Sequence, residues 1–126
     1  PPHDYIQATV VLEAWARRIA AWWEGGFDLL LTPTLPEPPT PLGAFDATPD
    51  DPLRGMMRAA QFVAFTMPFN VTGQPAVSLP LAWSPAGLPI GLQFVAGYGR
   101  EDLLLRTAAQ LEQAQPWRDR RPLLHA

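Results

Sequence analysis

The N-terminal segment alternates apolar and polar residues at the spacing of an amphipathic helix. Its apolar residues recur every three or four positions, which places them on one helical face: Tyr5, Ala8, Leu12, Trp15, Ile19 and Trp22. Asp4, with Gln7 three residues later, matches a capping box, in which side chains satisfy the free N–H groups of the first turn. Gly25 and Gly26 adopt without strain the left-handed conformation that ends helices. The pattern predicts a helix over residues 4–23.

A short apolar run and a long proline-rich stretch follow this helix. Residues 27–32 are apolar without alternation, which is typical of a strand buried on both faces of a sheet. Seven of the 16 prolines fall within residues 33–52, and proline there disfavours both helix and central-strand pairing. We therefore expect a Pro-rich loop over 33–52. Loops of this length are usually either functional or disordered, and the sequence leaves both alternatives open.

A second helix is predicted directly after the Pro-rich loop. Asp51 is an acidic N-cap residue, and Pro52 occupies the first helical position, where proline is favoured. The helix would run over 53–66 and end before Pro68, because proline cannot continue a helix. Its central part, 56–65, is apolar on nearly all sides, which is typical of a buried helix.

Two further apolar segments predict strands over 76–83 and 90–96, both too apolar for a half-exposed sheet. The residues between them, Ser84 to Gly87, read Ser-Pro-Ala-Gly and favour a tight turn. Pro80 lacks an N–H group and therefore predicts an edge position or a bulge.

The last predicted helix covers residues 101–114 and ends before Pro116. Glu101 and Asp102 lie in its first turn, where carboxylates interact favourably with the helix dipole. The complete order is α-β-loop-α-β-β-α, which indicates an α/β layer structure with helices covering a sheet. Three strands this apolar need cover on both faces and partners at both edges. We therefore interpret the chain as part of a wider sheet.

Composition and charge exclude several classes of function. The 126 residues include 9 Lys+Arg and 12 Asp+Glu, a formal net charge of −3. This balance lacks the basic surface that nucleic acids and anionic membranes require. The absence of cysteine excludes disulfides, thiolate ligands and a Cys nucleophile. All nine basic residues are arginines, so no lysine can serve as a general base or form a Schiff base. No apolar run approaches the roughly 20 residues of a membrane span.

The residues able to carry chemistry do not form a catalytic motif. His3 and His125 lie within three residues of the ends, where a base would be poorly held, and we interpret them as ordinary terminal residues. Ser78 and Ser84 lie outside any Gly-x-Ser-x-Gly elbow, and Ser78 is better interpreted as a hydrogen-bonded strand hydroxyl than as a nucleophile. The densest carboxylates lack the pattern of a calcium loop: Asp46, Asp50 and Asp51.

Three motifs stand out, and their order and spacing make them specific although each alone is weak. They are FDLLLTPT at 27–34, FTMPFNVTGQPAVSLP at 65–80 and GLPIGLQFV at 87–95. Together with the leucine-rich helix before Pro116 and Trp117, they resemble the C-terminal portion of an amidase-signature family hydrolase. The resemblance covers nearly the whole chain.

The resemblance implies that residues 1–126 are a C-terminal fragment of a single amidase-signature domain, part of an α/β/α sandwich with a mixed central sheet. Enzymes of this family hydrolyse carboxylic amides through a serine nucleophile, a second bridging serine and a lysine base. The lysine and the Gly-Gly-Ser-Ser segment belong to the N-terminal part. The resemblance therefore implies no catalytic residue in this chain, and an N-terminal portion of the same enzyme as its partner. The start at Pro1, without an initiator methionine or leader, favours the same interpretation.

The resemblance also implies a substrate-binding role for one helix face. In relatives, the face of the helix before the second motif lines the acyl pocket, and the matching positions are Ala60, Val63 and Met67. Their spacing of three and four fits one helical face. Relatives that use glutamine tend to carry an acid where this chain has Val63, so we expect an apolar or aryl amide as the small-molecule substrate. The alternative that Ala60 and Val63 are plain core residues stays open.

A second hypothesis is a non-catalytic binding or assembly module derived from the amidase fold. The unpaired apolar strands favour the enzyme over the module. We expect no cofactor, no metal, no nucleic-acid partner and no membrane partner. We also expect a cytoplasmic location, and the sequence leaves homodimer formation open.

Overall fold

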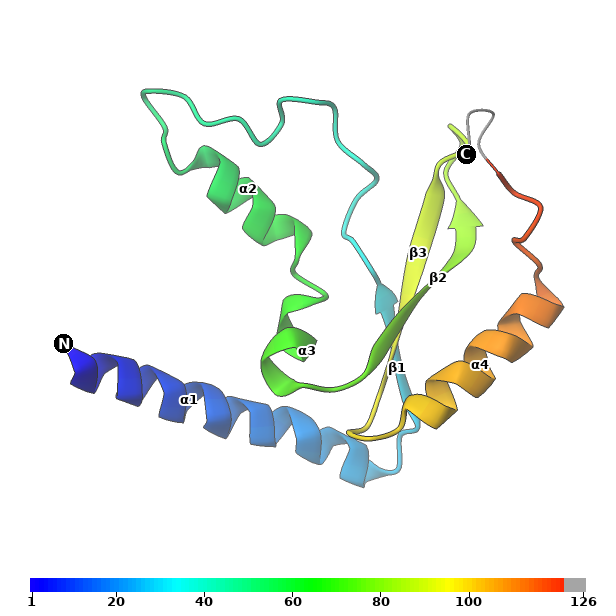
Figure 1. Cartoon of the computed structure of the whole chain (residues 1–126), viewed down its shortest axis with the longest axis horizontal. Coiled ribbons are helices and arrows are strands. Elements are labelled where there is room, and N and C mark those ends of the chain that lie inside the picture. The colour runs from blue at the N-terminus through cyan, green and yellow to red at the C-terminus, as the bar shows by residue number, and fades with distance from the viewer. Residues whose placement is uncertain (122–126) are drawn as a thin grey trace.

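The computed structural model, which describes residues 1–121, consists of a small antiparallel sheet and several helices (Figure 1). The helices are α1 (Pro2–Ala20), the 3-10 helix η1 (Ala21–Gly25), α2 (Arg54–Phe62), α3 (Met67–Thr72) and α4 (Glu101–Ala114). Helix α2 and most of α1 extend away from the sheet (Figure 1). The strands are β1 (Leu29–Pro33), β2 (Ala76–Trp83) and β3 (Pro89–Ala96). The expected Pro-rich loop connects β1 to α2 without regular structure apart from an isolated bridge between Thr48 and Asp51. None of the helices within residues 1–121 has the length and apolar character needed to cross a membrane.

The sheet has the strand order β1-β3-β2, with the central strand β3 antiparallel to both neighbours. Leu30 of β1 is paired with Val95 of β3, and Val77 of β2 is paired with Phe94. The predicted α/β class and the predicted order of the main elements are confirmed. Because all three strands are antiparallel, the mixed arrangement expected for a complete sheet is not represented within residues 1–121.

The core lies between α4 and one face of the sheet (Figure 1). Its buried residues come from β2, β3 and α4: Leu79, Phe94, Ala96 and Leu104. The prediction of strands buried on both faces is wrong for this chain. Leu31 is 55% exposed, and Ser78 on the opposite face is also exposed. The physical reason is that α4 is the one long helix packed on a sheet face within residues 1–121.

The hairpin of β2 and β3 has the turn and the bulge that the sequence predicts. Gly87 has a φ of 78° and donates its N–H to the Ser84 carbonyl at 2.9 Å, which closes the predicted tight turn. The register shifts between Pro80 and Ala82, so the predicted bulge at Pro80 is confirmed. The side-chain amide of Gln115 donates to the carbonyl of Leu81 at 2.9 Å, and this bond satisfies the bulged backbone.

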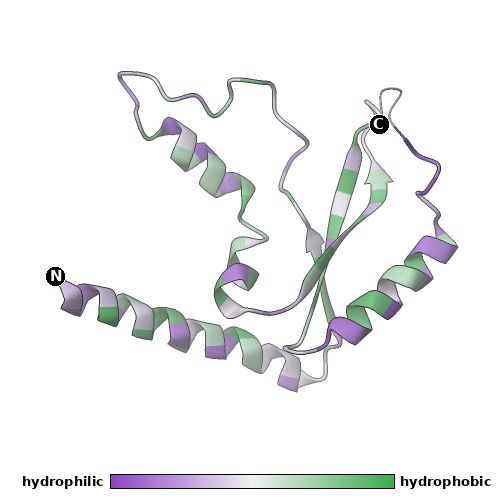
Figure 2. Ribbon diagram, in the orientation of Figure 1, coloured by the Kyte–Doolittle hydropathy of each residue, from purple (hydrophilic) through white to green (hydrophobic). Residues whose placement is uncertain are grey.

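Helix α1 differs from its prediction at its beginning. The helix starts at Pro2, so Asp4 lies inside the first turn and does not form the expected side-chain cap. The last turn tightens into η1, and Gly26, with a φ of 86°, ends it in the predicted left-handed conformation. Several apolar residues of α1 are more than half exposed, including Tyr5, Ile6 and Val11. Figure 2 shows apolar positions along the same helix.

The predicted helix over 53–66 is wrong in its extent. Helix α2 ends at Phe62, residues 63–66 form a turn, and the unpredicted helix α3 begins at Met67. Pro68 therefore lies in the first turn of a new helix, where its missing N–H costs nothing. Asp51 does not cap with its side chain; its backbone carbonyl accepts the Arg54 N–H at 3.4 Å. The expected burial of this helix is also wrong for this chain, since Met56 is 61% exposed.

Candidate functional site

The three predicted pocket residues lie around the break between α2 and α3. Ala60 is exposed in α2, Val63 is the half-buried C-cap residue, and Met67 is the first residue of α3 and 51% exposed. The assumption that they share one uninterrupted helix is therefore wrong. The Met67 N–H still donates to the Val63 carbonyl at 2.8 Å, which keeps these two residues one helical turn apart.

The predicted pocket is not closed by this chain. The three best-formed pockets within residues 1–121 are lined by residues other than Ala60, Val63 and Met67. The apolar face to which they belong is open, and Met56 extends it by one helical turn. A substrate pocket at this face needs a second wall from elsewhere.

The best-formed groove instead lies between the Pro-rich loop and the sheet. It has a volume of about 430 Å³ and is lined mainly by residues 33–39 and 89–91. Thr34 and Ser78 are among its lining residues, and their hydroxyl groups are hydrogen-bonded at 2.6 Å. The interpretation of Ser78 as a hydrogen-bonded strand hydroxyl is thus confirmed. Its partner Thr34, 44 residues away, was missed by the sequence analysis because no spacing rule connects a loop residue with a distant strand.

Gly91 makes this hydroxyl pair possible. A Cβ at position 91 would lie 2.6 Å from the Ser78 Oγ and 2.8 Å from the Thr34 Oγ1. Both distances are shorter than van der Waals contact, so any larger residue would push the two hydroxyls apart. This glycine is the second one in the GLPIGLQFV motif.

Gln93 ties together three segments on the same face. Its side chain is 4% exposed, and its amide nitrogen donates to the Thr32 Oγ1 at 3.1 Å and to the Phe65 carbonyl at 2.9 Å. These bonds connect β1 and β3 to the turn that precedes α3. Sequence reasoning did not single out Gln93, although a glutamine inside an apolar strand is a signal for a buried polar contact.

An ion pair connects the Pro-rich loop to α2. The Arg58 guanidinium lies 2.5 Å from the Glu37 carboxylate, with the two side chains 27% and 38% exposed. The hydrogen bond from Arg58 lowers the pKa of Glu37, and the same bond raises the pKa of Arg58. Both residues therefore stay charged at neutral pH.

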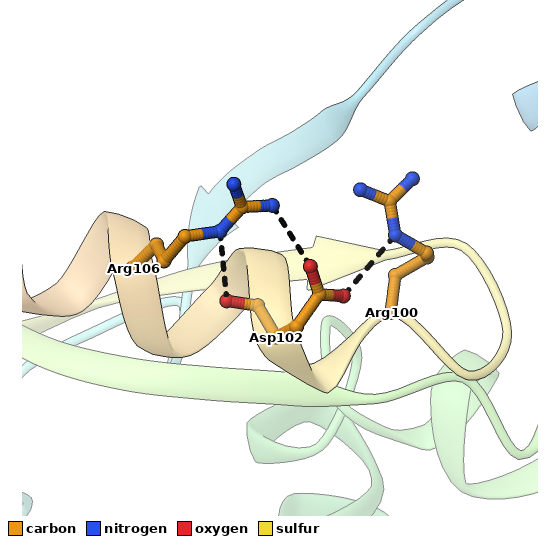
Figure 3. Close-up of polar contacts among 3 residues, drawn as sticks. All are labelled: Arg100, Asp102 and Arg106. Carbon is orange, nitrogen blue, oxygen red and sulfur yellow. Dashed lines mark hydrogen bonds and ion pairs between the residues drawn. The ribbon is translucent and has the colours of Figure 1, made fainter.

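A second charged cluster lies at the start of α4. Asp102 accepts from Arg100 at 3.2 Å and from Arg106 at 2.8 Å (Figure 3). The bond from Arg100 is the largest influence, and it lowers the pKa of the Asp102 carboxyl. All three side chains are at least half exposed, so the cluster is a solvated surface network. It is separate from α2, which lies on the other side of the sheet (Figure 1).

The arrangement can bind but has no activated nucleophile. Neither the Thr34 nor the Ser78 hydroxyl is hydrogen-bonded to an imidazole or a carboxylate within residues 1–121, and the sequence contains no lysine. His3 lies exposed at the start of α1, whereas His125 lies outside the described residues. No group of three His, Asp or Glu side chains within the described part could hold a metal ion.

Comparison with known proteins agrees with the motifs. The family model described as Amidase matches residues 2–105. The chain is 49% identical over 118 residues to 6-aminohexanoate-cyclic-dimer hydrolase from Paenarthrobacter ureafaciens, which is 90% of this chain and 24% of that protein. A solved structure of 6-aminohexanoate cyclic dimer hydrolase superposes with a TM-score of 0.82 at 49% identity, over 89% of this chain and 24% of that one. A crystal structure of an amidase gives a TM-score of 0.73 at 30% identity, over 91% and 26% respectively.

The chain spans about a quarter of the length of these relatives. That proportion fits the sequence expectation that it corresponds to one part of a larger α/β enzyme. It also fits the geometry, since the predicted pocket face is open and no nucleophile is activated within residues 1–121.

Proposed function

Because this chain belongs to the amidase family, we propose that it forms part of an enzyme that hydrolyses a carboxylic amide to an acid and an amine or ammonia. The observation that carries the proposal is the family match, which extends from α1 into α4. In that enzyme, residues 1–126 supply strands of the sheet and one wall of the acyl pocket.

The catalytic groups lie in the N-terminal portion of the same enzyme. There a serine attacks the amide carbonyl, and the lysine, acting through the bridging serine, removes the proton of the nucleophile and delivers a proton to the leaving amine. Backbone N–H groups stabilise the oxyanion of the tetrahedral intermediate. Water then hydrolyses the acyl-enzyme. The absence of lysine from this chain supports this division of labour.

The acyl pocket is lined in part by Ala60, Val63 and Met67. Their exposed or half-exposed apolar surface supports this role, because the group that covers it must itself be apolar. We propose an apolar or aryl amide as substrate. The 6-aminohexanoate cyclic dimer named for the relative at 49% identity is the first compound to test. Light scattering on the complete enzyme would decide whether it forms a homodimer, which the sequence left open.

The proposed activity is tested by comparing two proteins on a panel of amides. The complete enzyme should release acid and amine, whereas the isolated 126-residue chain should release neither. Hydrolysis by the isolated chain would contradict the proposal, because no group in this chain activates a nucleophile.

The pocket assignment is tested by a charge at its centre. Val63→Asp in the complete enzyme should lower kcat/KM for apolar amides by roughly tenfold or more, because a carboxylate beside an apolar acyl group is poorly solvated. Val63→Thr has nearly the same shape without the charge and should lose much less. Equal kinetics for Val63→Asp and the wild type would remove Val63 from the pocket.

The second candidate function is a non-catalytic binding module derived from the same fold. The exposed apolar residues of α1 favour it to the extent that they offer a surface for a partner. The coding sequence upstream of Pro1 separates the two candidates. A lysine followed by a Gly-Gly-Ser-Ser segment supports the enzyme, whereas an unrelated domain supports the module.

A further inference from the structure

Helix α2 has no extensive contact with any other helix or strand within residues 1–121. Its link to the sheet runs through the turn that follows it, where Gln93 donates to the Phe65 carbonyl. What touches α2 is the Pro-rich loop, which arches over it in Figure 1. The contacts come from Glu37 and Phe45 on the loop and from Gly55, Arg58 and Phe62 on the helix, and we call this set the loop–helix brace.

The brace combines an ion pair with aromatic packing. Arg58 binds Glu37 at 2.5 Å, donates to the Gln61 side chain at 3.2 Å, and lies 4.8 Å from the centre of the Phe62 ring. The Phe62 ring in turn meets the Phe45 ring edge-on, with centroids 5.2 Å apart at an angle of 64°.

The third contact is a close backbone approach. A Cβ at Gly55 would overlap the carbonyl oxygen of Phe45, so the loop backbone passes directly against the first turn of α2. The loop thus touches the helix at its beginning, its middle and its end. Three contacts spread along the helix restrict both its position and its rotation.

The brace and the proposed pocket residues lie on different faces of α2. At about 100° per residue, Gly55, Arg58 and Phe62 share one face. Measured from the centre of that face, Ala60 lies roughly 170° away on the same helical wheel, Met56 roughly 130° and Val63 roughly 110°. The loop therefore contacts a face of α2 different from the face that carries the apolar residues.

We propose that Glu37 and Arg58 are positioning residues that hold α2 in place behind the acyl pocket of the complete enzyme. The inference rests on the proposed function, since it takes Ala60 and Val63 as pocket residues. It goes beyond that function by assigning a role to the Pro-rich loop: the loop sets how far the pocket wall advances toward the acyl group.

The experiment measures the hydrolysis of a series of linear amides of increasing acyl length by the complete enzyme. Glu37→Gln and Arg58→Gln should each raise KM for long apolar acyl groups by on the order of tenfold, below the roughly hundredfold cost of a 1 Å misplacement. They should leave kcat and the KM of acetamide nearly unchanged, because acetamide does not reach α2. The double variant should cost no more than either single variant.

Two controls separate positioning from general destabilisation. Arg106→Gln removes a more exposed ion pair on α4, away from the brace, and should change neither KM. The charge swap Glu37→Arg with Arg58→Glu should recover part of the lost affinity for long amides. All variants should melt within a few degrees of the wild type, and amide hydrogen exchange across residues 54–62 should accelerate in the single variants.

The failures of the two proposals are distinguishable. If the wild-type complete enzyme hydrolyses no amide, the proposed function is wrong and the brace has no pocket to position. If hydrolysis is normal but both single variants affect short and long amides equally, the brace proposal alone is overturned. Unchanged hydrogen exchange across 54–62 in these variants would overturn it as well.

Discussion

Gly91 is the position in the groove where the lack of a side chain matters most. A methyl group there would force apart the Thr34 and Ser78 hydroxyls or bend β3. Gly91→Ala should therefore destabilise the complete enzyme by about 1–3 kcal/mol. Thermal melting measures the loss.

Two companion variants test the cause of that loss. Gly25→Ala should have little effect, since a Cβ there meets the Phe27 ring at an ordinary 3.4 Å. Adding Ser78→Ala to Gly91→Ala should recover part of the stability, because it removes the closer of the two hydroxyls. Equal melting temperatures for Gly91→Ala and the wild type would contradict the steric account.

Single residues were predicted well where the constraint is local. Gly26 ends its helix and Pro80 marks its bulge because each effect depends on the residue's own backbone. Gln93 and the partner of Ser78 were not predicted, since their contacts join segments far apart in the sequence. Asp4 did not cap because the helix extends past it to Pro2.

At the scale of elements, the Pro-rich loop and α2 act together, and their ion pair makes that contact depend on pH. The folded pKa of Glu37 is lowered below its ordinary value of 4.5 by the hydrogen bond from Arg58, the one charged group that pairs with it within residues 1–121. A lowered carboxyl pKa gives stability that is present above the ordinary value and is lost as the pH falls through the folded value.

This linkage predicts a pH-dependent difference between two proteins. The complete enzyme should melt at a higher temperature than its Glu37→Gln variant near neutral pH, and the difference should shrink as the pH falls below the ordinary Glu37 pKa of 4.5 and vanish below the lowered folded pKa. Melting curves at a series of pH values measure it. Glu24→Gln, at an exposed carboxylate outside the ion pairs found within residues 1–121, should show no such trend. A constant difference at all pH values would mean that the ion pair is not the cause.

The strands and α4 were predictable to within a residue or two, whereas the break after Phe62 was not. Strand and helix periodicities report burial, and β2, β3 and α4 bury their apolar faces against each other. Residues 56–65 carry an apolar pattern that continues through a turn, so periodicity alone could not locate the end of α2. The signal for α3 was Pro68, which the sequence analysis took as a stop although proline also favours helix beginnings.

The molecule as a whole exposes more apolar surface than its sheet and α4 can bury. Tyr5, Ile6 and Val11 on α1 are 76%, 57% and 64% exposed, and Met56 and Met57 on α2 are about as open. The isolated chain should therefore bind a hydrophobic dye and self-associate. Mixing it with the separately produced N-terminal portion should reduce both effects and restore amide hydrolysis.

Dye fluorescence, light scattering and an amide assay measure the three effects together. A monodisperse isolated chain with a cooperative melt and no dye binding would contradict the interpretation of these surfaces as interfaces within a larger enzyme. The sequence anticipated this surplus of apolar surface in general terms. The sequence could not show that the exposed apolar surface lies on α1 and α2, because this depends on which helix faces pack against the short sheet.

The bond from Gln115 to the bulged backbone at Leu81 has a consequence for production of the protein. Beyond Pro80, β2 is contacted by the segment after α4 at two points: the Gln115 amide bonds to the Leu81 carbonyl, and Arg120 lies over the Trp83 ring at 3.9 Å. Truncation of the gene after Ala114 would remove these contacts. The free edge of β2 could then pair with strands of neighbouring molecules and form insoluble fibres.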